Sequence, residues 1–438
     1  MKNIRNYFHK TIQCVTIFAL CFFTAIFSHA TTVDNTPTAE YLKIDSNPNG
    51  SPSRLVMFAK RYRRDGAKPI VLAHGFLNND EAMDIWARKF YNLGYDVWVF
   101  NHLGFGLKDR MSYTKNYQPG DYGFANLLNG MDQVIHHIVK TTNMKVIYTS
   151  FSMGGMTFYQ YVAGSYGEDQ NGLPKRSKTL AKERQELIAE AITIGAPNYD
   201  MRGLGLFLRA ITKIGYLLLD GPLKNAHFQV PLALGMATEK NIGIGGLFAL
   251  GQKVIRKEIL TPILADAMHL PNMGEHQNNL NYVFNFNFSN PHTDILRSFA
   301  RMYRFSHRLP APEITFPNLV VMGSLDRLAP PKQLLWHQKG LTQQAAPHRA
   351  ILLGGYGHLD LIYDKAVDEA LPYVDNFIKN PQAFYQQTPE IIELGKFRLR
   401  ERLLVDRFNS LVNTDMQNPQ FLPQIDLMAQ QRSCLKIY

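Results

Sequence analysis

Short apolar runs alternate along this chain with longer amphipathic stretches, and most of the runs end in small or polar residues. Such runs are typical of strands that are buried on both faces of a parallel sheet. The stretches between them, such as Glu81–Leu93 and Leu127–Lys140, have the spacing of helices with one apolar face. The pattern predicts an α/β fold in which helices flank a mostly parallel sheet. The predicted buried strands are Ile70–Ala73, Val97–Asn101, Lys145–Thr149, Ala191–Ile194, Leu319–Met322 and Ala350–Leu353.

The third predicted strand leads directly into the sequence SFSMGG (residues 150–155), which a helical stretch follows. Ser152 would then lie on a sharp strand-to-helix turn that raises its hydroxyl above the sheet. Such a turn needs small residues two positions before and after the serine. Gly154 meets this requirement, whereas Ser150 stands where glycine is usual. The alternative is a helix start that contains glycine and carries no chemistry.

Two further residues have the chemistry and the positions that a serine nucleophile requires, namely a base and a carboxylate that orients it. Asp326 follows the strand Leu319–Met322, and His358 lies in a glycine-rich loop after the last predicted strand. The chain order Ser152, Asp326, His358 is the order found in α/β hydrolases. As an alternative, Asp326 only caps its own loop in an Asx turn.

An oxyanion hole is expected at the end of the first predicted strand, which leads into the sequence HGF (residues 74–76). The backbone N–H groups of Phe76 and Met153 are the predicted donors to a developing oxyanion. Gly75 would let the backbone approach closely, and Gly154 would do the same at the serine turn. His74 is expected to support the turn geometry, with a role as a rival base left as the alternative.

The composition fits a folded protein with a sizeable core. Of the 438 residues 45% are hydrophobic and 19% are charged, which excludes a disordered or fibrous chain. The net charge of +11 favours association with anionic surfaces. Because the positive charge is dispersed and no binding motif is present, no nucleic acid partner is expected.

The chain is expected to be exported. Residues 1–30 combine a positive start, an apolar run from Val15 to Phe27 and small residues at Ser28 and Ala30. This arrangement is typical of a cleaved signal peptide, with an uncleaved anchor as the alternative. The destination would be the periplasm, the medium or an organelle lumen.

The domain organisation predicted from the pattern is a core with one large insertion. Residues 31–197 and 313–380 would form the core, and residues 381–438 a helical extension after it. Residues 198–312 are too long for a simple connection and are expected to form an inserted cap or lid. This insertion has 12 Lys and Arg against 7 Asp and Glu, which would attract it to anionic lipid. The alternative is a lid that only packs on its own domain.

Several stretches resemble the acid lipase branch of the α/β hydrolases, the gastric and lysosomal acid lipases. They are AHGF (73–76), GYDVW (94–98), Asn101, the Ser152 turn, residues 323–326 and HLD (358–360). The resemblance extends roughly from residue 70 to residue 380 without the insertion. It implies that Ser152 is the nucleophile, Asp326 the acid and His358 the base, with Phe76 and Met153 as oxyanion donors.

The residues and the resemblance together predict an exported serine hydrolase that cleaves carboxylic esters, with lipids as the expected substrates, through an acyl-enzyme intermediate. The alternatives are a binding protein that keeps the fold without catalysis, and an acyltransferase or thioesterase with the same triad. No cofactor and no metal ion are expected, because the mechanism needs neither and no Cys/His cluster has metal-ligand spacing.

Overall fold

The computed structural model describes residues 37–46, 55–76, 78–106, 108–169, 173–196, 292–305, 312–326, 328–331 and 346–397, with the isolated positions 217, 221 and 225. The chain divides into two units, Met1–Thr38 and Ala39–Tyr438, and every helix and strand below lies in the second. The predicted signal peptide, most of the predicted insertion and residues 398–438 lie outside the described residues. No helix in the described part of the chain has the length and apolar character of a membrane span.

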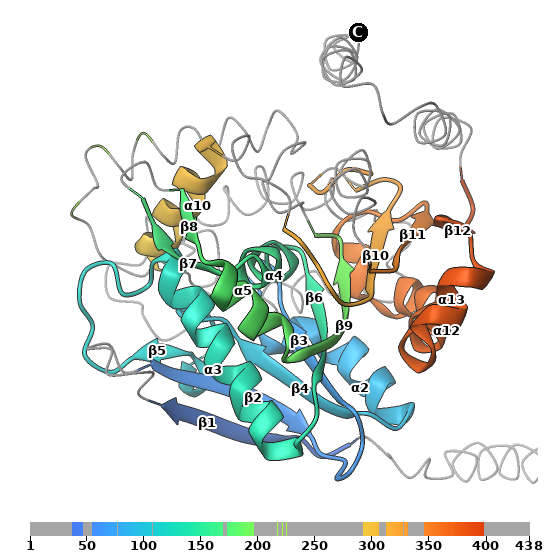
Figure 1. The fold of residues 1–438 in the computed structure, drawn as a ribbon, viewed down its shortest axis with the longest axis horizontal. Helices are drawn as coiled ribbons and strands as arrows, with labels where there is room; N and C mark the ends of the chain where they lie inside the picture. Colours follow the sequence, from blue (N-terminus) through green and yellow to red (C-terminus); the bar gives the residue numbers. More distant parts are fainter. Residues whose placement is uncertain are drawn as a thin grey trace, which may run out of the picture. The chain divides into compact units, whose positions relative to one another are not determined.

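A sheet of ten strands forms the centre of the second unit (Figure 1). Its strands are β1 (Glu40–Ser46), β2 (Leu55–Tyr62), β3 (Pro69–Ala73), β4 (Asp96–Asn101), β5 (Tyr113–Thr114), β6 (Val146–Phe151), β9 (Ile188–Ile194), β10 (Asn318–Gly323), β11 (His348–Gly354) and β12 (Ile391–Gly395). They lie in the order β1-β2-β4-β3-β6-β9-β10-β11-β12, and β5 pairs with β2. The strands from β4 to β12 in this order are parallel, whereas β2 is antiparallel to its neighbours. The mostly parallel sheet that the apolar runs predict is therefore confirmed.

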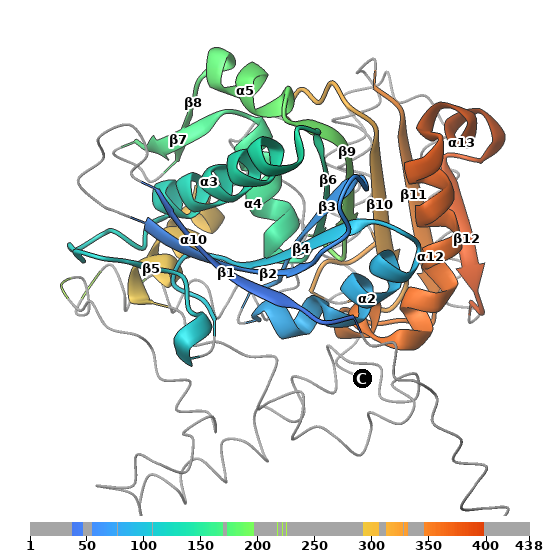
Figure 2. The ribbon, with the colours of Figure 1, turned by 90° about the horizontal axis from the view of Figure 1, so that it is seen from below.

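Helices cover both faces of this sheet. They are η2 (Asp80–Met83), α2 (Asp84–Asn92), η3 (Lys108–Arg110), α3 (Phe124–Thr142), α4 (Met153–Val162), α5 (Lys178–Gln185), α10 (Thr293–Phe305), η8 (Leu359–Ile362), α12 (Asp364–Lys379) and α13 (Pro381–Gln387). Figure 2 shows α3, α4 and α5 over one face, and α2 and α12 over the other. A small hairpin of β7 (Ser165–Glu168) and β8 (Pro174–Arg176) lies apart from the main sheet.

The central strands are apolar throughout because each face of the sheet packs against helices. In β3, Ile70 and Leu72 belong to the cluster that contains α2 and α12. Val71 and Ala73 belong to the cluster on the other face, with α3 and α4. Successive side chains of a strand point to opposite faces, so both sets of positions must be apolar here.

The predicted helical extension after residue 380 is corrected in part. The helix α13 does form, but Ile391–Gly395 is the strand β12 and pairs in parallel with β11 at the edge of the core sheet. The core therefore continues past residue 380. β-branched Ile391 and Ile392 favour a strand, and β12 is only partly buried, so its sequence has no long apolar run. Ile392 is buried and joins the core.

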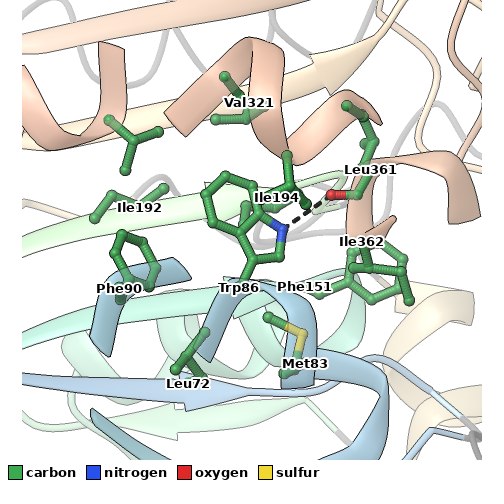
Figure 3. Close-up of a cluster of buried hydrophobic side chains, with 14 of the residues drawn as sticks. Leu72, Met83, Trp86, Phe90, Phe151, Ile192, Ile194, Val321, Leu361 and Ile362 are labelled. Atoms are coloured by element: carbon green, nitrogen blue, oxygen red, sulfur yellow. Dashed lines mark hydrogen bonds between the residues drawn. The ribbon is translucent and has the colours of Figure 1, made fainter. Parts of the chain in front are cut away.

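Trp86 connects α2 to the loop that carries His358 (Figure 3). Its indole is fully buried among apolar side chains from several strands. The Nε1–H group donates a hydrogen bond to the carbonyl oxygen of Leu361 at 3.0 Å. Leu361 lies in η8, which begins directly after His358. The hydrogen bond therefore fixes the position of the loop that carries His358.

We expect the substitution Trp86→Phe to lower the free energy of unfolding by about 1–3 kcal/mol, because it leaves the Leu361 carbonyl without its donor and leaves space in the core. Urea denaturation followed by circular dichroism measures this. Tyr166→Phe, at a half-exposed position, is the control and should change the value by less than about 0.5 kcal/mol. Equal losses in the two variants would contradict the role given to the indole.

Candidate active site

Ser152 lies on the sharp turn that the sequence predicts between β6 and α4. Its backbone has φ 51° and ψ −116°, a region that L-residues rarely adopt. Such a conformation costs about 1–3 kcal/mol and persists only where the surrounding structure enforces it. Here the Ser152 N–H donates to the carbonyl oxygen of Ile194 at 2.9 Å, so the neighbouring strand β9 holds the turn in place.

The glycines after Ser152 let α4 begin directly against the sheet. A Cβ atom at Gly154 would lie 2.8 Å from the carbonyl oxygen of Ala73, at the end of β3. A Cβ atom at Gly155 would lie 3.3 Å from the hydroxyl oxygen of Ser150. The Cβ atom of Ala196 would lie closer still, at 2.4 Å, so the contact with Ala196 is what requires glycine at 155. Ser150, which stands where glycine is usual, is fully buried, and its hydroxyl has no hydrogen-bond partner among the described residues.

The structure brings Ser152, Asp326 and His358 together at the carboxyl ends of three parallel strands. His358 Nδ1 lies 2.7 Å from Asp326 Oδ2, and His358 Nε2 lies 2.9 Å from the hydroxyl oxygen of Ser152. A carboxylate only accepts hydrogen bonds, so Nδ1–H donates to it and Nε2 accepts from the serine hydroxyl. Asp326 and His358 are buried, while Ser152 is partly exposed.

The Asp326 carboxylate is fixed by its own loop as well as by His358. Its Oδ1 atom accepts from the backbone N–H groups of Leu328 at 2.8 Å and Ala329 at 2.7 Å. The two interpretations of Asp326 from the sequence, loop cap and histidine partner, thus both hold for different oxygens of one side chain. The cap leaves only Oδ2 to face the imidazole.

The loops that carry Asp326 and His358 are packed directly on each other. A Cβ atom at Gly323 would lie 2.3 Å from the carbonyl oxygen of Tyr356, so no larger residue fits there. That carbonyl also accepts from the N–H of Leu325 at 2.9 Å. The distance between the acid and the base is therefore set by backbone contacts as well as by their own hydrogen bond.

The predicted oxyanion donors lie on either side of the serine turn. Met153 is the first residue of α4, where the helix dipole favours negative charge. Phe76 follows β3, which pairs with β6 up to the register Ala73–Ser150. Among the described residues, no acceptor is present for the N–H of either Phe76 or Met153. A Cβ atom at Gly75 would lie 2.8 Å from the Phe151 ring, so this position requires glycine.

His74 supports the loop that carries Phe76 and is not placed to act as a base. Its Nδ1–H donates to the carbonyl oxygen of Gly75 at 2.8 Å, and its Nε2 accepts from the N–H of His102 at 3.1 Å. Burial lowers the pKa of His74 to about 4, so the ring is neutral at neutral pH. Both nitrogens are occupied, and neither can take a proton from Ser152.

Part of the predicted insertion reaches the site. The helix α10 lies at the carboxyl-terminal end of the insertion and packs on the core. Asp294 accepts from the N–H of Gly120 at 2.9 Å, and Ser298 accepts from the N–H of Phe124 at 3.2 Å. The ring of Phe299 lies 5.8 Å from the ring of Phe76. Phe299 was not among the residues predicted for the site. The apolar spacing of Ile295 and Phe299 indicates a packing face of the helix, but not the partner of that face.

The strand order, the serine turn and the three meeting side chains define the fold as that of the α/β hydrolases. Residues 68–168 match the family model described as the alpha/beta hydrolase fold. None of the curated proteins matches the chain by sequence.

Solved structures similar to the chain include three enzymes from bacteria. The thermophilic esterase of Thermogutta terrifontis is 14% identical over 78% of this chain and 98% of its own, with a TM-score of 0.46. The carboxyl esterase of Bacillus coagulans is 13% identical over 80% of this chain and 100% of its own, with a TM-score of 0.48. The Cif epoxide hydrolase of Acinetobacter nosocomialis is 14% identical over 77% of this chain and 89% of its own, with a TM-score of 0.46.

Proposed function

We propose that the protein is a serine hydrolase that cleaves carboxylic esters with apolar groups. The observation that carries this proposal is the hydrogen-bonded series Ser152–His358–Asp326, with distances of 2.9 and 2.7 Å. Three residues of these types in this order and geometry are suited to acyl transfer.

In the first half of the reaction Ser152 Oγ attacks the ester carbonyl carbon while His358 Nε2 takes the hydroxyl proton. The Asp326 carboxylate stabilises the imidazolium and keeps Nδ1 protonated. The N–H groups of Phe76 and Met153 donate to the carbonyl oxygen as it becomes negative. The tetrahedral intermediate then collapses, the ester C–O bond breaks, and His358 gives its proton to the leaving alcohol.

In the second half, water attacks the acyl-enzyme carbonyl. His358 takes a proton from the water and then returns it to Ser152 Oγ as the carboxylic acid leaves. Ester and water are thereby converted into acid and alcohol. An alcohol or a thiol in place of water would give acyl transfer by the same residues, so the acceptor is a separate question from the nucleophile.

An aromatic wall beside the oxyanion loop supports an apolar substrate group. Phe76 is 37% exposed, and its ring contacts Phe105 at 6.4 Å and Phe299 at 5.8 Å between ring centroids. Burial of apolar substrate surface against such a wall is worth about 25 cal/mol per Å². Together with the resemblance to acid lipases, this favours lipid esters as the substrate class.

The proposed site of action is outside the cytoplasm, and the support for it is the signal-like sequence of residues 1–30. The proposed membrane partner is a surface of anionic lipid, which the positive excess of residues 198–312 would attract. Residues 1–30 and most of residues 198–312 lie outside the part of the chain that the structure describes.

The proposed function is tested with a panel of p-nitrophenyl esters of increasing acyl length and a fluorophosphonate label. We expect hydrolysis of long-chain esters and covalent labelling, with Ser152→Ala abolishing labelling and reducing kcat by about 10⁴-fold or more. Equal turnover by the two proteins would contradict the assignment. Activity confined to acetyl esters would remove the apolar preference alone. Adding a primary alcohol and analysing the products separates hydrolysis from acyl transfer.

A further inference from the structure

A buried polar network lies at the far end of the loop that carries Phe76. Asp80 and Asn101 are both fully buried and are joined by two hydrogen bonds. The backbone N–H of Asp80 donates to Asn101 Oδ1 at 2.7 Å, and Asn101 Nδ2 donates to Asp80 Oδ1 at 2.8 Å. Buried polar groups are costly unless they are paired, so this reciprocal contact strongly favours one arrangement of the two segments.

The Asn101 amide also reaches the loop that follows β4. Its Nδ2 atom donates to the carbonyl oxygen of Arg110 at 2.8 Å, and the Arg110 guanidinium donates to Asp80 Oδ2 at 3.0 Å. Arg110 also pairs with Glu81. Both donors and the acceptor of the Asn101 side chain are therefore used, and Asp80 has a partner on each carboxylate oxygen.

Lys60 places a second cation in the same cluster. Its ammonium group is buried and lies 2.9 Å from Asp84, 3.4 Å from Glu81 and 3.7 Å from Asp80. Burial alone would lower the pKa of Lys60, but the carboxylates of Asp84 and Asp80 outweigh it and raise that pKa. The cluster thus consists of compensated charges on β2, η2, α2 and η3, which are elements that surround the loop.

The loop between β3 and η2 is consequently held at both ends. At its start, His74 bonds to Gly75 and to the backbone of His102. At its end, Asp80 bonds to Asn101 and Arg110. Both anchors connect the segment to residues 101–110, and Phe76 lies between them.

We propose that Asp80, Asn101 and Arg110 are positioning residues that hold the Phe76 N–H where the oxyanion forms. This inference rests on the proposed function. None of the three is the nucleophile, acid or base, so they would act through the backbone of the loop. A misplaced oxyanion donor weakens the bond made in the transition state more than the binding of the ester.

The test uses Asn101→Asp in the full chain, because this change keeps the size and replaces two donors with an acceptor facing Asp80. Active sites are counted with a fluorophosphonate, and kcat is expressed per titrated site. We expect kcat to fall roughly 10- to 100-fold. The affinity for an alkyl boronic acid, whose adduct with Ser152 is tetrahedral, should fall roughly in parallel. KM should stay within about twofold.

Arg88→Gln is the matched control, because Arg88 lies in the same cluster but donates to Asp84 and not to the Asp80–Asn101 pair. It should keep the wild-type kcat and boronate affinity. If Asn101→Asp does not fold, Arg110→Gln replaces it, with an expected decrease in kcat of roughly three- to tenfold.

A purely structural role would give fewer titratable sites with an unchanged kcat per site and unchanged boronate affinity, and this result would overturn the proposal. It is distinguishable from failure of the proposed function, in which the wild type itself shows no hydrolysis that depends on Ser152.

Discussion

Asp326→Asn is expected to lower kcat for ester hydrolysis by about 10⁴-fold while the fold and KM change little. Asp326 Oδ1 accepts from the N–H groups of Leu328 and Ala329, so the introduced amide must turn its oxygen toward them. Its NH₂ group then faces His358 Nδ1. The imidazole must accept there, which moves its proton to Nε2, and it can no longer take the proton of Ser152.

Steady-state kinetics on a p-nitrophenyl ester measures this effect, and thermal unfolding monitors the fold. Asp375→Asn is the matched control, since Asp375 is on α12 and bonds Tyr95 and Lys379, away from the site. It should retain the wild-type kcat. If Asp326→Asn keeps more than about a tenth of the wild-type kcat, Asp326 does not set the histidine tautomer.

The meeting of Ser152, Asp326 and His358 was predictable because each has a local signal. Each follows a short apolar run, and the runs are parallel strands whose carboxyl ends lie along one edge. The turn at Ser152 adds its own signal in the glycines that follow it. Sequence could therefore predict the edge and the partners, while their catalytic roles stay a prediction.

The paired charges of β2 could not be predicted in this way. Lys60 and Arg61 suggest an exposed segment, yet both are buried. The partner of Arg61 is Asp96 on β4, at 2.9 Å, and that of Lys60 is Asp84 on α2. Asp96 is 35 residues from Arg61 along the chain and Asp84 is 24 residues from Lys60, so no local pattern indicates these pairs. The Asp80–Asn101 pair was missed for the same reason.

The free energy of unfolding is expected to fall as the pH falls from about 6.5 to about 4. Burial lowers the pKa of both His74 and His348 to about 4. Above pH 6.5 both rings are neutral in the folded and unfolded states, and their full contribution to the free energy of unfolding is present. Between pH 6.5 and pH 4 these histidines bind protons only in the unfolded chain, so the free energy of unfolding decreases as the pH falls. Below about pH 4 the contribution is lost. At ~1.4 kcal/mol per pKa unit, each histidine contributes about 3 kcal/mol.

The variant His348→Leu isolates one of these contributions. Among the described residues neither ring nitrogen of His348 has a hydrogen-bond partner, so leucine removes the titration without breaking a bond. Urea unfolding at pH 7 and pH 4.5 should show a loss on acidification that is about 2–3 kcal/mol smaller than in the wild type. The kcat at pH 7 should not change, because His348 begins β11 at the end of the sheet opposite the triad. Identical losses in the two proteins would show that His348 is not buried as a neutral ring.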